Sequence, residues 1–164
     1  MTALAALQYL GWSEWPITFD RTNHPNLVVE VGRFPLVISV VIETMRMTKI
    51  LLDGGSGIDI LYKDAFDKLN VDIRKLHALQ SPFHDIVPRR RVMPLGTIDL
   101  SMSFDDVVHY QKETISFEVV DFLGPYSAIF RRPCYAKFMD VLNYAYLKLK
   151  MRGPHSVIIV LGNF

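Results

Sequence analysis

The chain has 164 residues, the size of a single domain. Half of the residues are hydrophobic and 21% are charged, a composition that excludes disorder as the default state. The formal net charge of +1 does not indicate a strongly basic nucleic-acid-binding protein. The one cysteine, Cys134, excludes an internal disulfide framework and a multi-cysteine zinc site, and we predict that it is a buried structural residue.

The predicted elements, taken in chain order, are mostly short strands. Residues 1–31 show no clear periodicity and are predicted to be a leader or linker, followed by one folded domain at 32–164. Apolar runs predict deeply buried strands, and alternation of apolar with polar residues predicts strands with one buried face. Strands are expected at 36–42, 50–52, 97–104, 114–119, 147–151 and Val157–Leu161. Short helices are expected at 60–69 and 133–139.

Turn-forming residues separate these elements, because the chain contains nine prolines and nine glycines. Many short strands with turns between them favour a mostly-β barrel or sandwich. The most apolar run, at 36–42, is far shorter than the about 20 residues that a membrane-spanning helix needs, so no membrane association is expected.

Motifs for metals and cofactors are missing from the sequence. No two of the five histidines have the spacing of metal ligands on one helix. The glycines that follow Asp53 lack the Lys-Ser/Thr pair of a phosphate-binding loop, and neither a dinucleotide fingerprint nor a Gly-x-Ser-x-Gly nucleophile motif occurs. We therefore expect neither a metal nor another cofactor.

The most informative local pattern is an aspartate at the end of an apolar run, followed at once by glycines: Asp53-Gly54-Gly55-Ser56. As a local signal, Asp-Gly favours a tight turn between two strands. The functional alternative is an aspartic protease, in which two such carboxyls share a proton and activate a water molecule. The stretch occurs once, and the chain is too short for two lobes, so this chemistry would require a homodimer with one Asp53 from each chain.

Several segments in a fixed order resemble the retropepsin-like aspartic protease domain in the polyproteins of plant gypsy-type long-terminal-repeat retrotransposons. The resemblance covers most of the chain and includes Trp12-Ser13-Glu14-Trp15-Pro16, His24-Pro25, Gly32-Arg33-Phe34-Pro35, Leu52-Asp53-Gly54-Gly55-Ser56, Met93-Pro94-Leu95-Gly96, Arg132-Pro133 and Tyr146-Leu147-Lys148-Leu149-Lys150-Met151.

This resemblance implies a small closed β-barrel with one or two short helices that forms a homodimer. It implies that Asp53 is the catalytic carboxylate of an endopeptidase that cuts its own polyprotein inside the cell, in the cytoplasm and within the retrotransposon particle. Gly54, Gly55 and Ser56 would form the active-site loop, and Ser56 is a candidate for the hydroxyl that ties two such loops together. The segment at 83–96 corresponds to the substrate-covering flap, which would place Ile86, Val87 and Pro88 against the substrate.

One position departs from the family pattern. The family carries Gly-Arg-Pro before the C-terminal helix, and this chain carries Arg131-Arg132-Pro133. An arginine at the glycine position would overpack the site and bring a charge close to Asp53. This observation motivates the hypothesis that the chain comes from a decayed element with weak or no activity. The alternative function is therefore a catalytically inactive retropepsin-like module for dimerisation or protein interaction.

Two further polar features have plain interpretations. Arg89, Arg90 and Arg91 are expected on a solvated loop, and nucleic-acid binding is not expected because the total charge is close to neutral. Asp59 is expected to be a surface or loop carboxylate.

Overall fold

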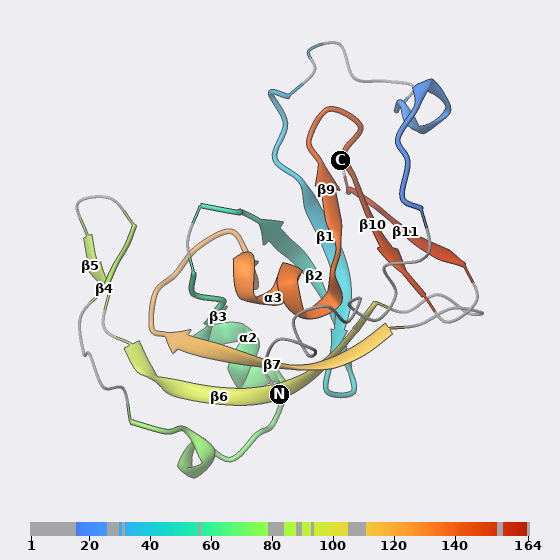
Figure 1. Cartoon of the computed structure of the whole chain (residues 1–164). Coiled ribbons are helices and arrows are strands. Elements are labelled where there is room, and N and C mark those ends of the chain that lie inside the picture. The colour runs from blue at the N-terminus through green and yellow to red at the C-terminus, as the bar shows by residue number, and fades with distance from the viewer. Residues whose placement is uncertain are drawn as a thin grey trace, which may run out of the picture.

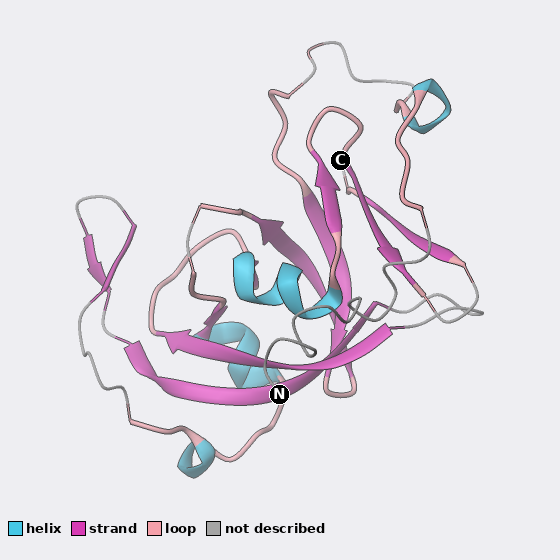
Figure 2. Cartoon of the chain, viewed as in Figure 1, coloured by secondary structure: helices cyan, strands magenta, loops and turns pink. Residues whose placement is uncertain are grey.

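The computed structural model describes residues 16–25, 30, 32–55, 57–78, 84–87, 90–92, 94–104, 111–153 and 156–163. Strands dominate this part of the chain, with two short α-helices and two 3-10 turns (Figures 1 and 2). In the same residues, no helix is long and apolar enough to cross a membrane.

Six strands close into a barrel in the order β1-β2-β8-β3-β7-β6. Most neighbours are antiparallel, and the exceptions are the parallel pairs β2–β8 and β3–β7. The closed barrel confirms the mostly-β prediction. The bounds are β1 Val37–Ile42, β2 Met45–Leu52, β3 Ile60–Tyr62, β6 Pro94–Phe104, β7 Gln111–Val120 and β8 Ala128–Phe130.

The two α-helices are α2 (Lys63–Lys68) and α3 (Arg132–Phe138), close to the predicted positions. The predicted helix at 60–69 begins too early, since Ile60–Tyr62 forms β3 instead. Tertiary pairing overrides the helical pattern there, because β3 is held between β7 and β8. The 3-10 turns are η1 (Arg21–Asn23) and η2 (Ile73–Lys75).

A second, three-stranded sheet has the order β11-β10-β9, with β9 at Val141–Asn143, β10 at Lys148–Arg152 and β11 at Val157–Leu161. Leu149 and Met151 of β10 point into the main core, and Lys148 and Lys150 alternate with them on the other face. A separate hairpin pairs β4 (His84–Val87) with β5 (Arg90–Val92).

The core fills the barrel with aliphatic and aromatic side chains. Phe117 and Phe130 lie with ring centroids 5.8 Å apart, and Phe104 meets Phe138 of α3 edge-on at 4.8 Å. Helix α3 is therefore anchored on the barrel by Phe138. Cys134, on the same helix, is fully buried, as predicted.

Strand register brings three chain segments together at one end of the barrel. Leu52 of β2 pairs with Phe130 of the parallel strand β8, so the residues that follow each, Asp53 and Arg131, become neighbours. Ile60 at the start of β3 pairs with Ile129 of β8, which places Asp59 beside Arg131. The register of β2, β8 and β3 thus builds the candidate site.

Candidate active site

Asp53 lies directly after β2, where its backbone N–H donates to the Phe130 carbonyl at 2.9 Å. This bond continues the β2–β8 pairing by one residue and fixes the start of the loop. The Asp53 side chain remains 48% exposed, and its Oδ1 accepts a hydrogen bond from the Gly55 N–H at 3.0 Å. The loop therefore presents a rigidly attached carboxylate that a substrate could reach.

The two loop glycines differ in what they allow. A Cβ atom at Gly55 would lie 3.2 Å from Asp53 Oδ1, so a side chain there would crowd the carboxylate. A Cβ atom at Gly54 would meet only Tyr135 Cε2 at 4.0 Å, an ordinary contact. Ser56, the predicted tie between two such loops, lies outside the described residues.

Two tyrosines hold the backbone around Asp53, and the sequence analysis did not single out either of them for this role. The Tyr144 hydroxyl donates to the Leu52 carbonyl at 3.2 Å, and the Tyr135 hydroxyl donates to the Phe130 carbonyl. Burial raises the pKa of both phenols above the ordinary value. Both hydroxyls therefore stay protonated at the pH values of interest and remain hydrogen-bond donors.

Arg131 occupies the position where the resembled family carries glycine. Its Nη2 lies 3.8 Å from Asp53 Oδ2, and its side chain is only 11% exposed. Its backbone N–H donates to Asp59 Oδ1 at 2.6 Å, while its Nε is buried without a hydrogen-bond partner. The structure thus brings a poorly hydrated cation to the candidate catalytic carboxylate.

Asp59 corrects one sequence-based expectation. It lies in a loop, as predicted, but it is 2% exposed rather than on the surface. The reason is that β3 begins at the next residue and is paired with a strand on each edge. Burial raises its pKa to about 6, against the opposing effects of the Arg131 and Cys134 backbone hydrogen bonds. Its Oδ2 has no partner.

A second buried carboxylate, Asp140, follows helix α3 and was not singled out from the sequence. Neither of its side-chain oxygens has a hydrogen-bond partner. Burial and the nearby charge of Asp59 raise its pKa to about 8. Burial, followed by the charges of Asp59 and Asp140, also raises the pKa of the Cys134 thiol, so this cysteine is not a ready nucleophile.

The predicted flap is described only in part. The backbone of Ile86 and Val87 belongs to β4, which pairs with β5 as a hairpin, and Val87 is opposite Arg90. Pro88 and Arg89 lie outside the described residues, as do the side chains of Ile86, Val87, Arg90 and Arg91. The contact of Ile86, Val87 and Pro88 with a substrate therefore stays a prediction.

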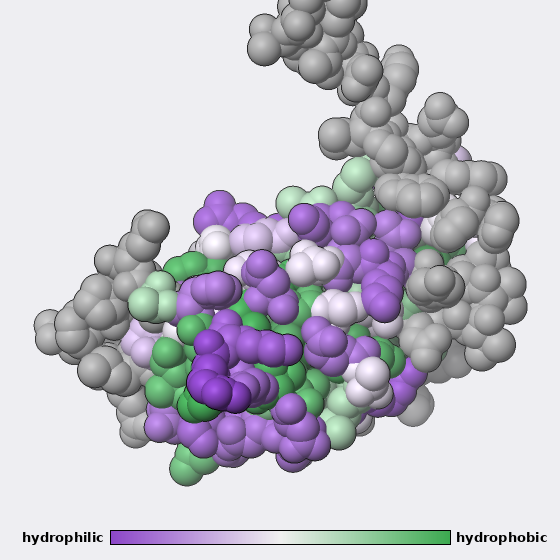
Figure 3. Space-filling model, turned by 90° about the horizontal axis from the view of Figure 1, so that it is seen from below, coloured by the Kyte–Doolittle hydropathy of each residue, from purple (hydrophilic) through white to green (hydrophobic). Residues whose placement is uncertain are grey.

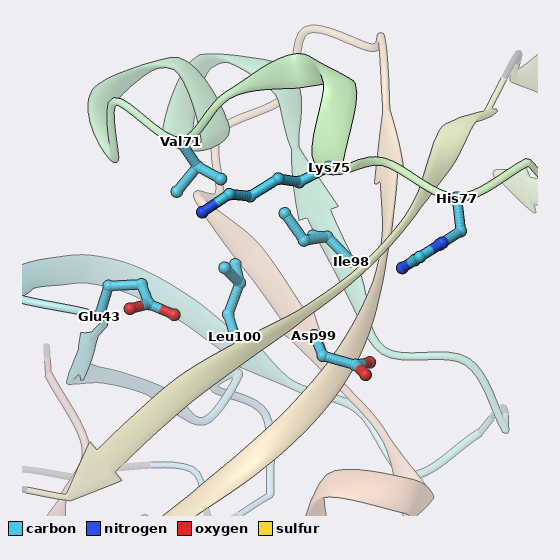
Figure 4. Close-up of a pocket in the computed structure, with 7 residues that line it drawn as sticks. All are labelled: Glu43, Val71, Lys75, His77, Ile98, Asp99 and Leu100. Atoms are coloured by element: carbon cyan, nitrogen blue, oxygen red, sulfur yellow. The ribbon is translucent and has the colours of Figure 1, made fainter.

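A pocket of about 350 Å³ lies apart from the Asp53 loop, between β6 and the 71–77 segment, and Figure 4 shows that both apolar and charged side chains line it. Its Glu43 accepts a hydrogen bond from the Ser101 N–H at 2.9 Å and so has a structural role. Among the described residues, no group of histidine, cysteine and acidic side chains could hold a metal ion.

Comparison with known proteins finds solved structures of similar fold. None of the protein-family models and none of the curated proteins compared with the chain matches it. The retroviral protease-like domain of Ddi1 from Leishmania major matches with a TM-score of 0.60 and 13% identity, over 79% of this chain and 94% of that one. A retropepsin-like aspartic protease from Rickettsia conorii matches with a TM-score of 0.48 and 15% identity, over 77% and 81%.

At these identities the likeness concerns the fold alone. The closed six-stranded barrel with two short helices is a retropepsin-like fold.

Proposed function

We propose that the chain is an aspartic endopeptidase domain that acts as a homodimer with one Asp53 from each copy. The observation that carries this proposal is the Asp53 loop, whose half-exposed carboxylate is held at the end of β2 in a retropepsin-like barrel. Since the Asp-Gly-Gly stretch occurs once in the sequence, a second copy has to supply the second carboxylate.

In the proposed reaction, the two carboxyls share one proton. The ionised carboxylate takes a proton from a water molecule, which attacks the carbonyl carbon of the scissile peptide bond. The protonated carboxyl donates to the carbonyl oxygen, and the tetrahedral intermediate collapses when the amine nitrogen leaves with a proton. The residues at 86–88 would lie over the substrate.

The sequence resemblance supports the finer part of the proposal. The substrate would be the chain's own polyprotein, of a plant gypsy-type retrotransposon, and cleavage would take place inside the cell in the retrotransposon particle.

Replacing Asp53 with Asn tests the proposed function directly. We expect the parent chain to cleave an unfolded reporter polypeptide between about pH 4 and pH 6, where a carboxyl dyad can share its proton. Asp53→Asn should abolish cleavage, because the amide keeps the shape but cannot exchange the proton. Asp64→Asn, which changes an exposed carboxylate on α2, should cleave like the parent. Cleavage that survives Asp53→Asn would rule out this mechanism.

The dimer surface is proposed to include β11, an edge strand of its sheet. Ile159 and Leu161 of β11 are 47% and 62% exposed, and an unpaired strand edge is a template for a second chain. By contrast, the face seen from below in Figure 3 shows hydrophilic side chains over much of its described area, with hydrophobic ones between them.

Placing lysine at position 159 or 161 should therefore weaken the dimer. Loss of one buried aliphatic side chain removes about 1.5–3 kcal/mol, so Ile159→Lys or Leu161→Lys should raise the dimer dissociation constant at least about tenfold. Sedimentation equilibrium measures this constant. Ile73→Lys, at a 60% exposed position on η2, is the matched control. Equal dissociation constants for all three variants would place the dimer surface elsewhere.

The alternative function is a retropepsin-like module that dimerises without catalysis. The observation that favours it is the Arg131 guanidinium 3.8 Å from Asp53. A folded dimeric parent that shows no Asp53-dependent cleavage would support this alternative.

A further inference from the structure

Residues 16–25, which precede the barrel, form an ordered turn. Asp20 caps η1: its Oδ1 accepts from the Thr22 N–H at 2.8 Å, and Asn23 Oδ1 accepts from the Asp20 N–H at 3.0 Å. Such a reciprocal capping box fixes the turn locally. In Figure 1 this segment (blue) runs beside the three-stranded sheet. We call residues 16–25 the strap.

Two lysines of β10 bind the strap. Lys150 Nζ donates to the Thr18 carbonyl at 2.7 Å and to Asn23 Oδ1 at 3.1 Å, and Lys148 Nζ donates to the Asn23 carbonyl. Lys150 is only 6% exposed, and its Nζ lies 4.7 Å from the centroid of the Phe19 ring. Hydrogen bonds from an ammonium group are among the stronger ones, so the strap is specifically seated rather than merely adjacent.

The strap also contacts Tyr146, in the turn that joins β9 to β10. The Phe19 ring stacks on Tyr146 with centroids 6.2 Å apart and planes 17° apart, and His24 meets it edge-on at 5.8 Å. Asn143 Oδ1 accepts from the N–H groups of Ala145 and Tyr146, at 3.0 and 2.9 Å. The turn at 144–147 is thus held from within by Asn143 and from outside by the strap.

The same turn reaches the candidate active site. Tyr144, two residues before Tyr146, donates its hydroxyl to the carbonyl of Leu52, the residue directly before Asp53. Burial is the main cause of the raised pKa of Tyr144, and a hydrogen bond from the Gly54 backbone and the charge of Asp53 also act on that pKa, so the phenol lies close to both groups. Contacts therefore run without a gap from the strap through Tyr146 and Tyr144 to the Asp53 loop.

We propose that the strap positions the Asp53 loop through the turn at 144–147, so that Tyr144 is a positioning residue for the catalytic carboxylate. The proposal rests on the proposed protease function and adds a means of regulation. Cleavage or displacement of the strap, which precedes the barrel in the chain, would loosen the loop that carries Asp53.

Amide hydrogen exchange in the full-length chain tests the coupling without requiring activity. The strap variant combines Phe19→Ala with Asn23→Ala, and Tyr144→Phe removes the hydroxyl. Each should speed exchange at Gly54 and Gly55 about tenfold, and combining them should add little, because both break the same connection. Arg21→Ala, an exposed change within the strap, is the matched control and should leave exchange unchanged. Exchange in β6 and β7 should not change in any variant, which shows that the barrel stays folded.

Two exchange results would overturn the proposal: unchanged rates at Gly54 and Gly55 in the strap variant, or effects of the strap variant and Tyr144→Phe that multiply. In an active parent we also expect kcat to fall about three- to tenfold with KM unchanged, because the substrate-binding surface is untouched. Faster exchange with an unchanged kcat would overturn the positioning role. A parent without any cleavage contradicts the proposed function instead, and the exchange measurement still decides whether the strap holds the loop.

Discussion

Replacing Arg131 with Gly is expected to raise kcat/KM for peptide cleavage by about three- to tenfold. The Arg131 guanidinium lies 3.8 Å from Asp53 Oδ2 and has little access to solvent, since its side chain is 11% exposed. A fixed positive charge beside a carboxylate competes with the proton that a dyad has to share. In the proposed dimer, two such cations would lie beside two catalytic carboxyls.

The magnitude follows from the exposure of the pair. Unit charges about 4 Å apart interact by about 4 kcal/mol at an effective dielectric constant of about 20. The Asp53 side chain is 48% exposed, so solvent screening reduces this interaction to about 0.7–1.4 kcal/mol, which corresponds to the stated rate change.

Two further substitutions separate charge from size at this position. Arg131→Lys keeps a cation and should show no gain in kcat/KM, while Arg131→Met keeps much of the volume without the charge and should gain nearly as much as Arg131→Gly. Steady-state cleavage of one reporter peptide by all four proteins measures this. No gain in folding or cleavage with Arg131→Gly would sink the hypothesis that this arginine marks a decayed copy.

The sequence predicts the parts of this fold that repeat a pattern along the chain. The alternation around Ile98 and Leu100, and around Ile115 and Phe117, predicts β6 and β7, because each has one face in the core. Strand β8 has three residues that are all buried, which is too short for any periodicity to appear, and it was missed.

In the candidate site, too, local motifs are visible in the sequence and contacts between distant segments are not. The local Asp-Gly-Gly motif at Asp53 by itself favours a tight turn, and the catalytic role of Asp53 is predicted from the resemblance of several segments in a fixed order. The contact between Asp53 and Arg131 depends on the parallel register that pairs Leu52 with Phe130, segments far apart in the chain. The roles of Tyr144 and Asp140 likewise come only from tertiary contacts, since no local pattern around either residue indicates them.

The contacts of residues 16–25, the described part of the predicted leader, could not be predicted from composition. Residues 16–25 lie outside the closed barrel, but Lys148 and Lys150 hold them against β10. A lysine whose partner is a backbone carbonyl leaves no signal in the partner's sequence. The domain boundary at residue 32 stays a prediction.

The free energy of unfolding is expected to fall by about 4–5 kcal/mol as the pH rises from about 5 to about 8. Folding raises the pKa of Asp140 from 3.8 to about 8 and that of Asp59 from 3.8 to about 6. Since the folded state holds these protons more tightly than the unfolded state, their contribution is fully present below about pH 4. It is lost as the pH rises through the folded-state values.

Burial is the main cause of both pKa shifts, and the groups around each carboxyl explain why the shift of Asp140 is the larger one. Asp59 accepts a hydrogen bond from the backbone N–H of Arg131, and this bond and the Arg131 charge both lower its pKa. Neither side-chain oxygen of Asp140 has a hydrogen-bond partner. Asp99 and Lys137 line the same hollow as Asp59. Asp140 therefore contributes most of the expected change, at about 1.4 kcal/mol per pKa unit.

Asp140→Asn should remove most of this pH dependence and make the chain more stable than the parent at about pH 8. Denaturant unfolding at several pH values measures the effect, and Asp64→Asn should keep the slope of the parent. A slope in Asp140→Asn equal to that of the parent would show that Asp140 does not hold its proton through folding.

The same variant also separates two causes of a loss of cleavage at higher pH. A loss of about 4–5 kcal/mol is comparable to the whole stability of many domains, so the parent would begin to unfold in the range where a dyad also loses its shared proton. Asp59 accepts the backbone N–H of Arg131, Asp140 lies close enough to Asp59 to be affected by its charge, and neither is proposed to touch the substrate. If the upper limit of the pH–rate profile moves to higher pH in Asp140→Asn, that limit reports unfolding. If it stays while stability rises, it reports ionisation of the two Asp53 carboxyls.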